Sequence, residues 1–158
     1  YSPQRNEIFD EALRKGRLRF TTDERNLLAR NAGIKPIIRA MRSGRPFLML
    51  PDMDFGRKES VFVPFFDIPA ATLTAPARLA AATEGQIIPV ITRFQPHYRG
   101  WEVRFFPPWE NYPGDDIEQA THFMNSFIEE RILEAPSEYF WSHKRFKTRP
   151  EGMPRVYD

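Results

Sequence analysis

The 158-residue sequence contains no cysteine, eight glycines and three histidines. The lack of cysteine excludes a disulfide framework, a thiolate zinc site and a cysteine nucleophile. The glycines are too scattered for a phosphate-cradling loop, and no Gly-x-Ser-x-Gly motif supplies a nucleophile elbow. No run approaches the roughly 18 apolar residues of a membrane span. With 41% hydrophobic and 28% charged residues, global disorder is also excluded, and a globular domain with its own core remains.

The basic and acidic residues are unevenly distributed around a net charge of +2. Residues 1–58 carry a balance of +6, residues 110–142 a balance of −7, and the last sixteen residues a balance of +3. Eighteen of the 23 basic residues are arginine, which binds phosphate and carboxylate groups in a bidentate fork. The amino-terminal third therefore favours a phosphate-bearing ligand or an anionic membrane surface, with a solvated charged face as the alternative.

Hydrophobic spacing and capping residues predict alternating helices and strands. Because helices alternate with strands, we expect an α/β fold, with a mixed, largely parallel sheet flanked by helices. Three or four strands are few for that class, and the chain starts at Tyr1 rather than methionine. We therefore expect a fold truncated at its amino side. The predicted helices are 4–15, 21–33, 35–44, 74–84, 115–136 and 137–143, and the predicted strands are 47–52, 61–66, 87–94 and 101–106, the last with one face exposed to water.

One histidine stands in a pattern typical of catalysis. His97 precedes Glu102 by five positions, which matches the His-x-x-x-x-Asp/Glu pattern of glycerolipid acyltransferases. The predicted structure argues against a catalytic pair, because Glu102 lies in an alternating strand and His97 in the turn before it. We interpret the match as chance. His122 is predicted to be an ordinary helix-face residue, and no second histidine stands at metal-ligand spacing, so no metal site is expected.

Two short segments are better candidates for a binding site. In GRLRF (16–20), Arg17 and Arg19 project to one side if the chain is extended. In LPDMDFG (50–56), Asp52 and Asp54 follow a predicted buried strand, and ligands of open α/β sheets gather at the carboxyl ends of strands. These carboxylates could orient arginines or hydrogen-bond a sugar. A turn stabilised by local aspartate–backbone bonds is the alternative.

The ordered segments GRLRF, LPDMDFG, VFVPFFDIPAAT, ARLA, IIPV and EYFWSHKRFKTRPEG resemble the lipid A biosynthesis acyltransferases. These bacterial lauroyl and myristoyl transferases belong to the lysophospholipid acyltransferase superfamily. The resemblance implies transfer of a fatty acyl chain from acyl carrier protein to a hydroxyl of a lipid A precursor, at the cytoplasmic face of the inner membrane and without a cofactor. It also implies that the catalytic histidine motif lies upstream. Residues 1–158 would then be the carboxy-terminal portion of a single acyltransferase domain, inactive alone.

The resemblance also implies roles for particular residues. Arg17 and Arg19 match an arginine motif and are assigned to substrate phosphate, and Asp52 and Asp54 match a Pro-Asp-x-Asp motif. The family more often has glycine where this chain has Asp67. Further predicted contacts are Arg93 in the same cleft, and Lys144, Arg145, Lys147 and Arg149 at anionic headgroups.

The predicted partners are acyl carrier protein, a phosphorylated glycolipid acceptor and the membrane surface, with no nucleic acid. The alternative function is a non-catalytic basic module that binds anionic lipid or nucleic acid.

Overall fold

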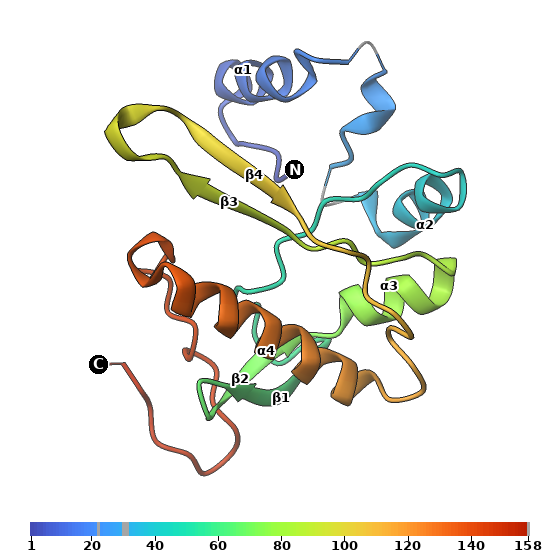
Figure 1. Ribbon diagram of the computed structural model, residues 1–158. Coiled ribbons are helices and arrows are strands. Elements are labelled where there is room, and N and C mark those ends of the chain that lie inside the picture. The colour runs from blue at the N-terminus through green and yellow to red at the C-terminus, as the bar shows by residue number, and fades with distance from the viewer. Residues whose placement is uncertain (22, 30–31, 158) are drawn as a thin grey trace. The chain divides into compact units, whose positions relative to one another are not determined.

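The computed structural model describes residues 1–21, 23–29 and 32–157 (Figure 1). The chain divides into two compact units, Tyr1–Phe47 and Leu48–Asp158, and each is described by itself.

The described residues of the first unit form helices α1 and α2 with 3-10 structure between them. Helix α1 spans Glu7–Leu18 and begins at Asn6, whose side chain accepts a hydrogen bond from the Phe9 backbone N–H at 3.0 Å. The predicted stop at Gly16 is wrong, because the helix runs through this residue. Helix α2 spans Ile34–Arg42 and confirms the third predicted helix. Within the predicted helix 21–33 the described residues form η1, Glu24–Asn26, and a 3-10 position at Ala32, whereas residues 22, 30 and 31 lie outside the described residues.

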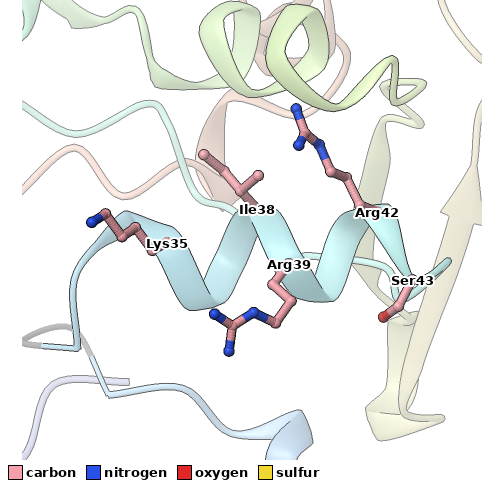
Figure 2. Close-up of a pocket in the computed structure, with 5 residues that line it drawn as sticks. All are labelled: Lys35, Ile38, Arg39, Arg42 and Ser43. Atoms are coloured by element: carbon pink, nitrogen blue, oxygen red, sulfur yellow. The ribbon is translucent and has the colours of Figure 1, made fainter.

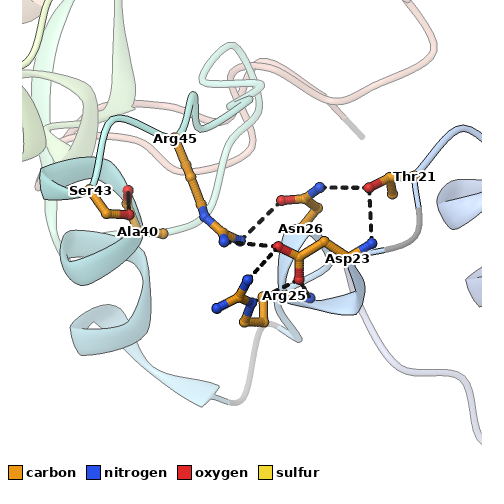
Figure 3. Close-up of polar contacts among 7 residues, drawn as sticks. All are labelled: Thr21, Asp23, Arg25, Asn26, Ala40, Ser43 and Arg45. Atoms are coloured by element: carbon orange, nitrogen blue, oxygen red, sulfur yellow. Dashed lines mark hydrogen bonds and ion pairs between the residues drawn. The ribbon is translucent and has the colours of Figure 1, made fainter.

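A carboxylate joins η1 to the turn after α2 (Figure 3). Asp23, rather than the predicted Thr21, caps η1, and its carboxylate accepts from Arg25 Nε and from Arg45 Nη2, both at 2.8 Å. Arg45 Nη1 also donates to Asn26 Oδ1 at 3.2 Å. The Arg25 side chain is the main reason why the pKa of Asp23 lies well below its ordinary range. Arg45 is thus committed to a contact within this unit.

The second unit contains two antiparallel hairpins instead of the expected largely parallel sheet. Strand β1, Ser60–Phe65, pairs with β2, Ile68–Leu73, and β3, Val90–Phe94, pairs with β4, Trp101–Phe105. Parallel neighbours need a crossover of a dozen or more residues, whereas only Phe66 and Asp67 separate β1 from β2. The short connections therefore impose antiparallel pairing, and the expectation of parallel strands was wrong for the described residues.

The turn between β1 and β2 depends on two residues with positive φ. Phe66 and Asp67 have φ angles of 49° and 60°, the left-handed pair that a two-residue hairpin of type I′ requires. Aspartate adopts this conformation more readily than most non-glycine residues. Asp67 therefore forms a tight turn at the position where the resembled family more often has glycine.

Helix α4, Ile117–Glu134, packs on β1 of the first hairpin, and α3, Ala75–Thr83, packs against α4. Figure 1 shows α4 lying across β1 and β2. As predicted, α4 begins at Asp116, whose carboxylate accepts from the backbone N–H groups of Glu118 and Gln119 at 2.8 and 3.0 Å. The core is formed by Phe65, Ala70 and Ile132, with Phe66, Ile128, Tyr139 and Phe146 packed against it.

Three predicted segments differ from the structure. Residues 47–52 form no strand, and Leu48 and Leu50 are 79% and 67% exposed, because an apolar run without a pairing partner does not become a strand. Residues 137–143 contain only the end of η4, Pro136–Glu138, and turns. All five residues of β4 are exposed, so neither of its faces is buried in the described part of the chain. Among the described residues, no helix is both long and apolar enough to cross a bilayer.

The core position of Phe65 gives a stability prediction. Phe65 is 1% exposed and contacts the rings of Phe66, Tyr139 and Phe146. Phe65→Ala should lower the free energy of unfolding by about 3–5 kcal/mol. Phe140→Ala, at a 68% exposed position, should change it by less than about 0.5 kcal/mol. The check is urea denaturation followed by tryptophan fluorescence, and equal effects of the two substitutions would contradict this core.

Candidate functional site

The site is built around the buried carboxylate of Asp54, which is 4% exposed. It accepts hydrogen bonds from the Thr148 backbone N–H at 2.6 Å, from Thr148 Oγ1 at 2.8 Å and from the Gly56 backbone N–H at 2.9 Å. Two of these three donors come from a residue 94 positions further along the chain. The carboxylate thereby joins the Pro-Asp-x-Asp segment to the carboxy-terminal segment.

His143 makes the second connection between these segments. Its Nε2 accepts a hydrogen bond from the Asp54 backbone N–H at 2.9 Å. In this contact Nε2 uses its lone pair as the acceptor. We name the four residues Asp54, Gly56, His143 and Thr148 the Asp54 latch.

Arg145 lies in the interior and not at the predicted membrane-contacting surface. It is 2% exposed, and it donates from Nη1 to the Ala71 carbonyl at 2.8 Å and from Nη2 to Thr72 Oγ1 at 2.7 Å. Its guanidinium also lies 5.0 Å from the centre of the Phe65 ring. Burial lowers the pKa of Arg145, and the nearby carboxylates of Asp54 and Asp52 oppose that shift. The arginine next to the aspartates is therefore a core residue.

Asp52 is half-buried beside Tyr139. Burial raises the pKa of Tyr139 to about 12, and the charge of the Asp52 carboxylate adds to the shift. The Asp54 carboxylate already accepts hydrogen bonds from the backbone and hydroxyl donors of the latch. Asp52 is thus the member of the pair that is better placed to meet a ligand.

The other three basic residues predicted at the membrane occupy two different environments. Arg149 donates to the Pro69 carbonyl at 2.6 Å and is half-buried, which ties the carboxy-terminal segment to β2. Lys144 and Lys147 are exposed. Their predicted contact with headgroups stays a prediction, as does that of Arg149.

The predicted substrate arginines are found in two places. Arg17 is exposed in the last turn of α1, and Arg19 follows the helix with its guanidinium 4.6 Å from the centre of the Phe20 ring. Because this backbone is helical, the two side chains do not share the side that an extended chain would give them. Arg93 belongs to the second unit, where Nη2 donates to the Arg131 carbonyl at 2.8 Å and to Glu134 Oε2 at 2.9 Å. It holds β3 against α4, and its predicted substrate role stays a prediction.

His97 and Glu102 are not joined in the structure. His97 is exposed in the loop between β3 and β4 with a φ of 58°, and the Glu102 carboxylate accepts from Gln95 Nε2 at 3.1 Å. Over the described residues no group of three or more histidine, cysteine or carboxylate side chains is arranged to hold a metal ion.

Two of the surface hollows lie away from the aspartates. One runs along α2 and is lined by Lys35, Ile38, Arg39, Arg42 and Ser43 (Figure 2). The other belongs to the second unit and lies between the end of α3 and the segment 107–113, with Trp109 and Tyr112 in its wall. Neither includes Asp52 or Asp54.

Sequence reasoning missed the partners of the aspartates. His143 was known only as one of three histidines, and Thr148 was noted only as a letter of the closing motif. The available signal is that the segments LPDMDFG and EYFWSHKRFKTRPEG both carry polar side chains that need hydrogen-bond partners when buried. Nothing in the sequence paired them.

Comparison with known proteins identifies relatives over nearly the whole chain. Residues 1–148 match the profile of the family described as bacterial lipid A biosynthesis acyltransferase. The lipid A biosynthesis lauroyltransferase of Escherichia coli (strain K12) is 37% identical over 99% of this chain, and the palmitoleoyltransferase of the same strain is 33% identical over the same share. The myristoyltransferase of that strain is 32% identical over 98% of the chain. The chain covers 50%, 50% and 47% of these relatives, so it spans about half their length.

The latch gives a prediction for hydrogen exchange. Asp54→Ala removes a buried acceptor of three bonds and leaves the Thr148 N–H without a partner, so the Thr148 amide should exchange at least about 10-fold faster and stability should fall by about 3 kcal/mol. Asp67→Asn, at the exposed hairpin turn, should leave that amide unchanged. Mass-spectrometric exchange on the peptide around Thr148 measures both, and a still-protected amide in Asp54→Ala would refute the latch.

The raised pKa of Tyr139 gives a pH prediction. Since burial raises this pKa from 10.0 to about 12, the neutral phenol stabilises the fold fully below pH 10 and loses that contribution as the pH rises through 12. The absorbance at 295 nm of the wild type minus that of Tyr139→Phe should show a tyrosinate transition near pH 12. In concentrated guanidinium chloride the same difference should titrate near 10. A midpoint near 10 in the folded protein would show that Tyr139 is not buried.

Proposed function

The chain belongs to the bacterial lipid A biosynthesis acyltransferase family, and from this membership we propose that its protein transfers a fatty acyl chain to a lipid A precursor or a related glycolipid. The observation that carries the proposal is the match over residues 1–148, together with relatives named for lauroyl, palmitoleoyl and myristoyl transfer. The proposed donor is acyl carrier protein, and the proposed place is the cytoplasmic face of the inner membrane.

The proposed reaction is the acylation of a hydroxyl group by a thioester. A histidine upstream of this chain acts as the general base and takes the proton of the acceptor hydroxyl. The acceptor oxygen then attacks the thioester carbonyl, the new C–O bond forms, and the C–S bond breaks. The thiolate of the carrier leaves and regains a proton. The reaction as written requires no metal or dissociable cofactor.

Within this scheme the described residues bind and position the substrate. We assign the exposed Arg17 and Arg19 to the phosphate groups of the acceptor, since arginine binds phosphate through paired N–H donors. Asp52 is assigned to a hydroxyl of the acceptor sugar. Asp54 acts indirectly, because its latch fixes the backbone that carries Asp52. Arg93 is proposed as a further substrate contact, although its guanidinium is bonded to the Arg131 carbonyl and to Glu134 in the structure.

The proposed function predicts that the 158-residue chain by itself does not turn over acyl carrier protein. Its one His-x-x-x-x-Glu pattern places an exposed histidine beside a carboxylate that is bonded to Gln95. The full-length protein should transfer radiolabelled acyl groups from acyl carrier protein to a phosphorylated lipid A precursor, measured by thin-layer chromatography. Replacing the upstream histidine with alanine should abolish transfer, while His97→Ala should leave the rate within about twofold of the wild type.

Two outcomes would contradict this assignment. Turnover by the 158-residue chain that His97→Ala abolishes would make His97 the base. Salt-sensitive binding to vesicles or oligonucleotides, without acyl transfer by the full-length protein, would favour the non-catalytic binding module.

A further inference from the structure

Helix α2 carries an apolar stripe and a basic stripe side by side. Ile34, Ile37, Ile38 and Met41 recur at the spacing of one helix face. Lys35, Arg39 and Arg42 follow the i, i+4, i+7 spacing on the neighbouring face. We name these seven residues the α2 surface.

The α2 surface is accessible in the structure. None of its residues is buried, Ile34 is 50% exposed, and Lys35 and Arg39 are exposed. The sequence contains no acidic residue between Glu24 and Asp52, so no carboxylate of this stretch neutralises the basic stripe.

The charged ends of the α2 surface are spread out. In Figure 2 the side chains of Arg39 and Arg42 start from one face of the helix and diverge, with Lys35 at its amino-terminal end. A single phosphate ion needs donors that converge on one point, as they do in bidentate arginine sites. Separated cations beside a half-exposed apolar stripe suit an extended surface of negative charge with an apolar layer beneath it.

We propose that α2 docks on an anionic lipid bilayer, with its apolar stripe in the headgroup–acyl boundary and the exposed Lys35 and Arg39 against lipid phosphates. This inference rests on the proposed function, because it names the surface by which the protein would approach a lipid substrate. It also moves the membrane contact away from the carboxy-terminal basic segment. There Arg145 is buried and Arg149 is bonded to the Pro69 carbonyl, which leaves Lys144 and Lys147 exposed.

The test is co-sedimentation of the 158-residue chain with two kinds of vesicle. One consists of phosphatidylcholine only, and the other also contains about 30 mol% of the anionic lipid phosphatidylglycerol. Each cation near an anionic surface strengthens binding by about 5-fold, so the double variant Lys35→Gln/Arg39→Gln should lower partitioning by roughly 25-fold. The matched control Lys144→Gln/Lys147→Gln should lower it by less than about twofold. Ile34→Gln, which keeps every charge, should lower it roughly 10-fold. Far-UV circular dichroism checks that each variant is folded.

Several results would overturn the docking surface. These are no binding to the anionic vesicles, equal binding to neutral vesicles, or an equal loss in the Lys144/Lys147 control. Displacement from vesicles by inorganic phosphate, but not by chloride at the same ionic strength, would show a soluble-anion site instead. Displacement by a single-stranded oligonucleotide at that ionic strength would favour nucleic acid. The vesicles contain no acyl donor, so vesicle binding is measured independently of acyl transfer. Vesicle binding can therefore fail while acyl transfer by the full-length protein succeeds, and acyl transfer can fail while vesicle binding succeeds.

Discussion

The second unit depends on the burial of one carboxylate. Asp54 is removed from water, and an ionised carboxylate without hydrogen-bond donors would be strongly destabilising there. The Gly56 N–H and the two donors of Thr148 satisfy it, and His143 accepts the N–H of Asp54 itself. Because these donors come from both ends of the unit, the Pro-Asp-x-Asp segment holds its position only when the carboxy-terminal segment is in place.

The carboxy-terminal segment also places the buried guanidinium of Arg145 in the core. The hydroxyl of Thr72 accepts from Arg145 Nη2 and from Asn125 Nδ2, and donates to the Ala70 carbonyl. This one side chain therefore connects β2, α4 and the residues that follow α4. Such a network is strong when complete and sensitive to the loss of any member, because each lost partner leaves a polar group buried in a medium of low polarity.

Local signals predicted the elements whose causes are local. Helices α3 and α4 and strand β4 were predicted correctly, because their signals act within a few residues. These signals are the alanines of α3, Asp116 at the start of α4 and the polar turn before Trp101. The sheet and the site depend on contacts between distant residues. Leu48 and Leu50 suggested a buried strand but have no pairing partner in the structure, and the pairing of Asp54 with Thr148 spans 94 positions. The resemblance to a family found the Pro-Asp-x-Asp motif, but neither the motif nor the composition revealed which donors it binds.

The abundance of arginine has two physical explanations, which composition alone cannot separate. Arg45, Arg93, Arg145 and Arg149 place their guanidinium groups on carbonyls, carboxylates or a hydroxyl of the same unit, so they act as cross-links of the fold. Breaking such contacts to reach a ligand would leave acceptors unpaired. Phosphate recognition is therefore better suited to cations that remain exposed, such as Arg17, Lys35 and Arg39. All three lie in the first unit, where the sequence also concentrates its positive charge, and the long acid-free stretch around α2 keeps that charge from being neutralised locally.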